Sequence, residues 1–157
     1  MPNHCENELT IVGPEKELLI FKKRAVARSP NWQSEDTDKS GLKKLDKLSC
    51  NVFIPIPASA LKSFNDSGYE WCVKNWGTKW GCYDVIVSKE KGSLHYYFQS
   101  AWSPPEPVVV AMSKQHPLLK FSLKYWESGV GYRGVLVVKK GKILKEECYE
   151  YRGSRGG

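Results

Sequence analysis

The sequence predicts an α+β domain in which helices cover one face of a mostly antiparallel sheet. Segments with alternating apolar and polar residues, which are typical of strands, are interleaved with segments whose apolar residues recur at helical spacing. The chain has 157 residues, of which 41% are hydrophobic, and this is enough for one domain with its own core. Such mixtures of elements fold most simply as helices packed on one side of an antiparallel sheet.

The chain opens with a strand and a helix. Residues 7–12 alternate in polarity and predict the strand. Pro14 suits the first position of the helix that follows, because a proline there needs no hydrogen bond from its nitrogen. We expect this helix to end near Arg28, before Ser29 and Pro30.

A long segment then separates this unit from the remaining strands. We interpret residues 29–81 as a tryptophan-rich insertion. Residues 31–49 are polar and predict a mobile loop. Residues 51–57 contain two prolines, which predict an extended and irregular segment.

Two capping boxes predict where further helices begin. Ser67 with Glu70 precedes a short helix that we expect to end at Gly77. Ser103 with Glu106 has the same spacing and predicts the start of a second helix.

The rest of the chain is rich in strands. Residues 83–87 and 94–102 predict a hairpin, and residues 121–125 predict a strand after the second capped helix. Residues 131–139 and 142–151 predict a final hairpin. Without the insertion and this last hairpin, the order is βαββαβ, which is the ferredoxin-like order.

We therefore expect a single ferredoxin-like domain over residues 1–151 and a disordered tail over residues 152–157. The N-terminus lacks a basic region followed by an apolar run, so we expect no signal peptide. No stretch approaches the roughly 20 apolar residues of a membrane helix, so we expect no membrane partner and a cytoplasmic location.

Charge and cysteine content narrow the classes of partner. There are 24 basic and 17 acidic residues, a net charge of +7, which favours nucleic acid, nucleotides or an acidic protein surface as partners. A basic surface that only aids solubility is the alternative, since the lysines are spread along the chain.

The five cysteines have scattered spacings and no C-x-x-C pair, which favours free thiols.

Three segments resemble one family. They are residues 2–13, residues 71–80 with the run Asn-Trp-Gly-Thr-Lys-Trp, and residues 101–105. They are similar to the YubB-type, Api-like ferredoxin-fold proteins of phages and plasmids, over residues 2–135. The resemblance implies the ferredoxin-like fold and a mobile-element origin, and it implies no defined activity.

Two positions depart from the family pattern. His4 stands where the family usually has tryptophan, and Gly81 stands where it usually has aspartate. If these positions line a ligand site, this member binds a different ligand.

The candidate binding site is a cluster of tryptophan, amide, threonine and lysine side chains in these segments. Flat rings can sandwich a base, amides can hydrogen-bond its edge, and a lysine can meet a phosphate. The alternative is that the cluster belongs to the core, because tryptophan-rich insertions often cover the open face of a small sheet. The candidate residues are Asn3, Asn7, Trp71, Asn75, Trp76, Thr78, Lys79, Trp80 and Trp102.

Metal binding and catalysis have weaker support. Cys5 next to His4 could join Cys72 or Cys82 around zinc, but the spacing matches no standard motif. We expect no metal and no cofactor. No nucleophile or phosphate-loop motif is present.

The residues that could act in catalysis are few. Asp84 in an apolar strand is a candidate buried carboxylate. His116 is placed by sequence at a helix end, and His95 lies within a strand, so the evidence favours a protein that is not an enzyme.

The sheet itself is a further candidate surface for nucleic acid. Tyr97 and Trp126 are predicted to share one face, and Phe98 and Phe121 the other. The sequence pattern of RNA-recognition sheets is absent, and we expect the insertion and the final hairpin to cover part of the sheet.

The sequence therefore predicts an accessory binding protein that holds a nucleotide or nucleic acid through the tryptophan, asparagine and lysine cluster, in a counter-defence role. One alternative is an inhibitor that blocks a host protein complex with its basic surface. Another is a small enzyme that acts on nucleotides. The oligomeric state is left open.

Overall fold

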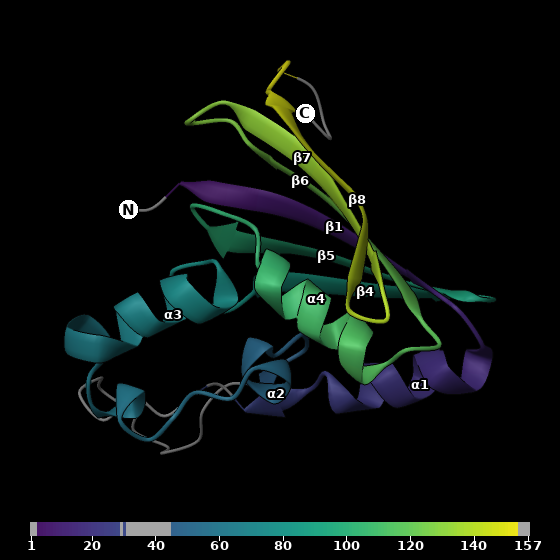
Figure 1. The fold of residues 1–157 in the computed structure, drawn as a ribbon, viewed down its shortest axis with the longest axis horizontal. Helices are drawn as coiled ribbons and strands as arrows, with labels where there is room; N and C mark the ends of the chain where they lie inside the picture. Colours follow the sequence, from purple (N-terminus) through teal and green to yellow (C-terminus); the bar gives the residue numbers. More distant parts are fainter. Residues whose placement is uncertain (1–2, 29, 31–44, 154–157) are drawn as a thin grey trace.

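The core of the fold is a six-stranded sheet with the order β4-β5-β1-β6-β7-β8 (Figure 1). The computed structural model describes residues 3–28, 30 and 45–153. Every neighbouring pair of strands in this sheet is antiparallel. The strands are β1 (His4–Val12), β4 (Tyr83–Glu90), β5 (Ser93–Ala101), β6 (Lys120–Glu127), β7 (Tyr132–Lys139) and β8 (Lys142–Glu150).

Two longer helices, α1 (Glu15–Arg24) and α4 (Glu106–Gln115), lie on the same face of this sheet (Figure 1). Helix α1 follows β1, and α4 connects β5 to β6. The strands β1, β4, β5 and β6 with these two helices form the predicted βαββαβ unit, and β1 lies between β5 and β6. The predicted α+β class and ferredoxin-like order are confirmed, and β7 and β8 add the predicted hairpin.

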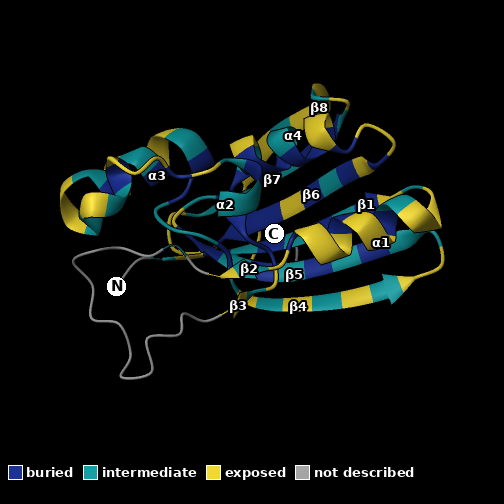
Figure 2. Cartoon of the chain, turned by 90° about the horizontal axis from the view of Figure 1, so that it is seen from below, coloured by how far each residue is buried: buried dark blue, intermediate teal, exposed yellow. Residues whose placement is uncertain are grey.

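The pattern of burial along the strands separates a helix-covered face from an open face. Strand β5 alternates buried and half-buried residues along most of its length. The helix-covered face of β5 carries Tyr96 and Phe98, which pack with Phe21 of α1 and Phe121 of β6 in the core. Figure 2, seen from the helix side, shows buried stretches of the sheet strands beneath α1 and α4. Edge strand β4 has no buried residue at all.

The segment between α1 and β4 forms short elements at one end of the sheet. Strand β2 pairs only with β3, in a two-stranded antiparallel ribbon. The elements are β2 (Ala27–Arg28), β3 (Leu45–Asp46), α2 (Cys50–Phe53), a 3-10 turn η1 (Ala60–Lys62), a π turn η2 (Phe64–Gly68) and α3 (Tyr69–Trp76).

One prediction for this region was wrong, and another was right only in part. Helix α1 ends at Arg24, and the chain then extends to pair Arg28 with Leu45 instead of continuing as helix. Residues 51–53 lie inside helix α2, whereas Ile54 is extended and residues 54–57 are irregular, as predicted. The Asn51 side chain accepts a hydrogen bond from the Ile56 nitrogen at 2.8 Å, which closes this turn.

Both predicted capping boxes were also wrong. Helical backbone begins before Ser67, at a π turn whose N-cap is Ser63. The Ser67 hydroxyl therefore does not cap a helix, and it donates to backbone carbonyls that include that of Ser63, at 3.2 Å. The Ser103 hydroxyl donates to the carbonyl of Gly77, so it ties α3 to the β5–α4 connection. In each case the serine hydroxyl donates to a backbone carbonyl, in the preceding turn for Ser67 and in a distant segment for Ser103. It does not accept a hydrogen bond from the helix start, as a cap would.

The open face of the sheet is not covered by the final hairpin. That hairpin extends the sheet sideways, and its turn bends toward α4, where the Gly141 nitrogen donates to the Ser113 hydroxyl at 3.0 Å (Figure 1). The expectation that it covers part of the sheet was therefore wrong.

The predicted mobile loop falls mainly on residues 31–44, and most of the predicted tail on residues 154–157; both ranges lie outside the described residues. None of the helices in the described ranges has the length and apolarity needed to span a membrane.

Candidate functional site

Three of the predicted site residues are part of the folded core. Asn7, Trp76 and Thr78 are each 2% exposed or less. The Asn7 amide nitrogen donates to the Ser100 hydroxyl at 2.9 Å, and the Trp76 indole nitrogen donates to the Ile54 carbonyl at 2.9 Å. The Thr78 hydroxyl donates to the carbonyl of Ala101 at 2.8 Å. These polar groups therefore serve buried backbone and side-chain partners.

Two more predicted residues support the same core from within α3. The Asn75 amide nitrogen donates to the carbonyl of Trp71, one turn earlier, at 2.9 Å. The Trp71 ring packs edge-on against Trp76, with centroids 5.6 Å apart. Both residues are half-buried.

Asn3 and Trp102 lie together at the start of β1. The Trp102 nitrogen donates to the Asn3 carbonyl at 2.9 Å, and Trp102 holds a left-handed backbone with φ of 70°. Asn3 also lines a polar hollow of about 500 Å³. The other residues of this hollow are His4, Glu6, Trp126, Glu127, Ser128, Gly129 and Tyr151.

The remaining two predicted residues, Lys79 and Trp80, belong to a chain of aromatic contacts at the surface. The Lys79 ammonium lies 5.2 Å from the ring centroid of Tyr69 and 5.2 Å from that of Trp80. Both distances are within the range of cation–π attraction. The structure therefore places this lysine between two rings.

We call the chain of rings the aromatic row. Its members in order are Tyr69, Phe64, Trp80, Tyr83 and His4. Successive ring centroids are 6.4, 6.3, 6.4 and 5.6 Å apart. All five residues are exposed or half-buried. The row begins in η2 and α3, crosses the start of β4, and ends at β1, next to the polar hollow.

The end of the row is fixed by a hydrogen bond. The His4 ring nitrogen Nδ1 and the Tyr83 hydroxyl are 2.6 Å apart. Burial, and to a lesser degree the neighbouring Asp84 carboxylate, raises the pKa of Tyr83 to about 12. The phenol is therefore protonated at neutral pH and remains available as a hydrogen-bond donor.

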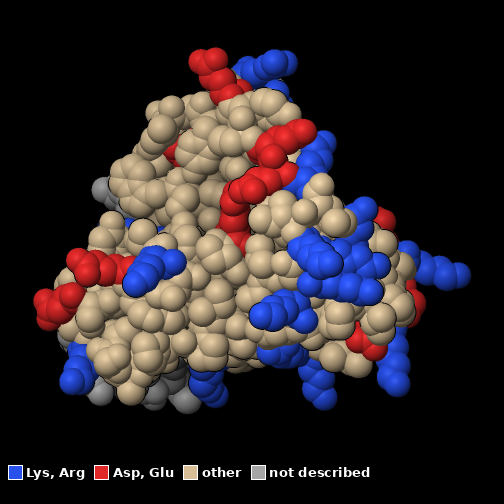
Figure 3. Space-filling model, in the orientation of Figure 1, with Lys and Arg blue, Asp and Glu red and all other residues tan. Residues whose placement is uncertain are grey.

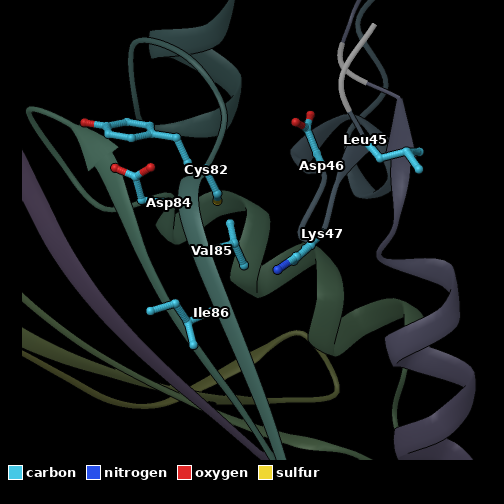
Figure 4. Close-up of a pocket in the computed structure, with 8 residues that line it drawn as sticks. Leu45, Asp46, Lys47, Cys82, Asp84, Val85 and Ile86 are labelled. Atoms are coloured by element: carbon cyan, nitrogen blue, oxygen red, sulfur yellow. The ribbon is translucent and has the colours of Figure 1, made fainter. Parts of the chain in front are cut away.

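A groove of about 490 Å³ adjoins the row between β3 and the outer edge of β4 (Figure 4). This volume is within the range of about 300–1,000 Å³ that small-molecule sites have. The groove carries charges of both signs, from Asp46, Lys47 and Asp84 (Figure 4). Its other lining residues are Leu45, Cys82, Tyr83, Val85 and Ile86.

The structure contradicts the interpretation of Asp84 as a buried carboxylate. Asp84 is exposed and has a left-handed backbone with φ of 51°. It lies in an irregularity of the β4–β5 pairing, between Tyr83 and Ile86. Residues of the edge strand β4 alternate between half-buried and exposed, and Asp84 takes an exposed position, so an apolar strand does not bury this carboxylate.

The cysteines do not form the suggested metal set. Cys82 lies against Cys50, with the sulfurs 3.6 Å apart, and not beside Cys5. Burial raises the pKa of the Cys5 and Cys72 thiols to about 12 in each case, which disfavours the thiolate that binds metal. Within the described residues, no group of three or more potential ligands could hold a metal ion.

The two histidines outside the row have structural partners. His116 is buried, and its Nε2 lies 2.8 Å from a guanidinium nitrogen of Arg24. Burial, and then the Arg24 charge, lowers the pKa of His116, so the ring is a neutral acceptor. His95 lies 3.3 Å from the Thr10 hydroxyl on the open face. The Ser93 hydroxyl lies 3.0 Å from Nε2 of His95, so both ring nitrogens of this histidine have hydroxyl partners.

Comparison with known proteins places the chain in a family. A family model described as the ferredoxin-like domain in Api92-like protein matches residues 75–154. The chain belongs to this Api92-like family. Its structure is similar to the crystal structure of a protein api92 from Yersinia pseudotuberculosis, with a TM-score of 0.71, over 98% of this chain and 99% of that chain. The two chains are 11% identical, so this likeness shows the fold alone. No curated protein matches the chain.

Sequence reasoning found the centre of the aromatic row and missed its flanks. Lys79 and Trp80 were predicted, whereas Phe64, Tyr69 and Tyr83 were not. These three residues lie in a polar turn, at a helix start and at a strand start, with no shared spacing. Trp80, in the loop between α3 and β4, contacts both Phe64 and Tyr83 and so connects these rings.

Proposed function

We propose that this protein binds single-stranded nucleic acid, with the bases stacked on the aromatic row. The observation that carries this proposal is the unbroken contact of five rings at the surface, with the Lys79 ammonium between two of them. Aromatic side chains along a positively charged surface are the usual means of holding bases without reading their sequence. The net charge of +7 agrees with an anionic ligand.

The shape of the row favours a strand over a lone nucleotide. Ring centroids about 6 Å apart form an open surface rather than an enclosed pocket. A single base stacks on one ring, whereas successive bases of a strand can use Trp80 and Tyr83 in turn. Each stacked base contributes about 1–3 kcal/mol in such sites.

The open face of the sheet continues from the end of the row. Tyr97 lies on this face opposite Glu8 of β1, and its hydroxyl donates to Glu6. Trp126 is on the same face, as the sequence predicted, but it is only 6% exposed. Tyr97 therefore offers a further ring beside the row, and Trp126 does not.

The phage or plasmid setting and the counter-defence role remain part of this proposal. They rest on the sequence resemblance, and a bound strand or nucleotide used by a host in signalling would be the ligand in that setting. The protein-interaction alternative draws on the same basic surface. It requires binding to an acidic protein with no affinity for oligonucleotides, so the experiment below distinguishes the two.

The test is a fluorescence anisotropy titration of a labelled 16-nucleotide single strand, as DNA and as RNA. We expect Trp80→Ala to weaken binding about 5- to 150-fold, which corresponds to the loss of one stacking contact of about 1–3 kcal/mol. Trp80→Phe retains a ring and is expected to retain most of the affinity. The melting temperature of each variant is measured alongside.

A matched pair of lysine variants controls for charge. The Lys79 ammonium lies between two rings of the row, whereas Lys74 is exposed on α3 away from the row. Lys79→Gln should weaken binding more than Lys74→Gln, although both remove one positive charge. Failure of the wild-type protein to bind either strand, or equal affinities of Trp80→Ala and wild type, would contradict the proposal.

A further inference from the structure

Three lysines face one another across neighbouring strands at the far end of the open face. Lys120 of β6 is paired directly with Lys139 of β7, and Lys139 is paired directly with Lys142 of β8. Directly paired residues project from the same side of a sheet, and neighbouring strands are about 4.8 Å apart. Like charges in this arrangement repel and destabilise the sheet.

Two more lysines complete the group at the β7–β8 turn. Lys140 and Gly141 both have positive φ, of 54° and 73°, as the tight turn of a hairpin requires. A Cβ at Gly141 would lie 3.3 Å from Cβ of Lys114 at the end of α4, and the Gly141 nitrogen donates to the Ser113 hydroxyl. The turn is therefore held against α4. We call Lys114, Lys120, Lys139, Lys140 and Lys142 the lysine corner.

The lysine corner has no acidic partner among the ion pairs of the described residues. Those ion pairs involve Lys89, His95 and Lys145. Figure 3 shows Lys and Arg side chains gathered over the β7–β8 turn and the end of α4. Three lysines on the open face, with two more at the adjoining turn and helix end, fit closely spaced phosphates.

The lysine corner and the aromatic row lie at opposite ends of the sheet. His4, at the end of the row, begins β1, and Val12, at the other end of β1, is paired with Lys120. Nine residues of strand span about 26–30 Å. A mononucleotide cannot reach both places, whereas a strand of several nucleotides can.

We infer that the lysine corner holds the phosphate backbone of the same single strand whose bases stack on the aromatic row. This inference rests on the proposed function. The nucleic acid crosses the open face over Tyr97, Thr10 and Ser122. These residues lie on the neighbouring β-strands β5, β1 and β6, between the aromatic row and the lysine corner. The row supplies stacking, and the corner supplies most of the dependence on salt and on strand length.

Acidic groups on the open face restrict this path. The Glu6 carboxylate accepts hydrogen bonds from Tyr97 and Gln99, and Glu8 is paired opposite Lys124. A nucleic acid that crosses β1 at Thr10 avoids Glu6 and Glu8, because Thr10 lies closer to the lysine corner than these carboxylates do. Charge and hydrogen bonding thus both favour a diagonal route.

The experiment compares short and long strands over a range of salt concentrations. The variant Lys120→Gln/Lys139→Gln/Lys142→Gln is titrated with labelled strands of 4 and 16 nucleotides by fluorescence anisotropy. The matched control is Lys16→Gln/Lys22→Gln/Lys23→Gln, which removes three exposed charges from α1, on the other side of the sheet.

For the 16-nucleotide strand, the corner variant should lower the slope of log affinity against log salt by about 2. Each lost phosphate contact on a single strand lowers it by about 0.7. The 4-nucleotide strand, which cannot reach the corner from the row, should bind the corner variant and the wild type equally. The corner variant should melt no lower than the wild type, because the substitutions remove like-charge repulsion.

The outcomes separate the two proposals. An unchanged salt slope for the 16-nucleotide strand, with binding still weakened by Trp80→Ala, would overturn the inference and leave the proposed function standing. Equal weakening of the 4- and 16-nucleotide strands would also overturn it. The inference would also be overturned if the corner variant lost affinity for a 16-base-pair duplex but kept its affinity for the 16-nucleotide single strand. Loss of binding by the corner variant with no effect of Trp80→Ala would refute the proposed function instead.

Discussion

Two parts of one short segment have opposite environments. Trp76 and Thr78 are almost fully buried, and their polar groups bond to backbone carbonyls. Lys79 and Trp80, the next two residues, are half-exposed and contact surface rings. The segment contains one tryptophan in the core and another in the aromatic row, four residues apart. Residue type alone therefore does not identify a binding residue.

Gly77 makes this change of environment sharp. It ends α3 with φ of 77°, a conformation that favours glycine. A Cβ at this position would lie 2.8 Å from Cδ of Pro107, so the chain also approaches α4 too closely for a side chain. The turn directs Thr78 into the core and the following residues outward.

The largest effect should come from the buried side. Trp76→Ala removes a large core ring and its hydrogen bond to Ile54, and we expect a loss of about 3–5 kcal/mol in the free energy of unfolding. Urea denaturation measures it. A loss below about 1 kcal/mol would mean that Trp76 behaves like the surface residues Lys79 and Trp80 and not like a core residue.

Thr78→Val should have the next largest effect. It preserves the shape of the side chain but leaves the Ala101 carbonyl without its partner, which should cost about 1–3 kcal/mol. Thr78→Ser keeps the hydroxyl and serves as the control in the same urea titration. If Val and Ser variants are equally stable, the hydrogen bond does not stabilise the core.

Lys79→Gln should change stability far less. The ammonium loses contact with two partly exposed rings, and exposed cation–π contacts contribute about 0.5–1 kcal/mol. Lys74→Gln on the same segment provides the baseline. A loss above about 2 kcal/mol would mean that Lys79 belongs to the buried group, and the contrast between the two parts would disappear.

The smallest effect is confined to alkaline pH. Because the pKa of Tyr83 is raised to about 12 in the folded protein, the unfolded chain releases this proton first as the pH rises. The resulting contribution is intact below about pH 10 and declines as the pH rises toward about 12. Urea titrations at pH 8 and pH 11 should show a smaller alkaline loss for Tyr83→Phe than for wild type. Equal losses would show that Tyr83 ionises equally in both states.

Local patterns predicted most strands but misassigned the side-chain caps of two helices. Alternation located β5 and β6 to within a few residues, because one face of each is buried. Ser67 and Ser103 matched a capping pattern, but both hydroxyls bond to carbonyls outside the predicted cap. A pattern of four residues cannot register such competing partners.

The candidate site was predictable only in part for the same reason. Lys79 and Trp80 stood out by composition and by resemblance, whereas Tyr83 and Phe64 gave no signal. The lysine corner was hidden as well, since Lys120 and Lys142 are far apart in the chain and meet only through β7.

The sequence by itself determined the α+β class and the ferredoxin-like order of elements, because hydrophobic periodicity is a local property of each segment. Tertiary structure alone decided which of the predicted residues are buried and which are exposed. It also brought together the rings of the aromatic row and the charges of the lysine corner. These groupings depend on strand pairing and on the docking of α3 and α4, which join residues that no local pattern relates.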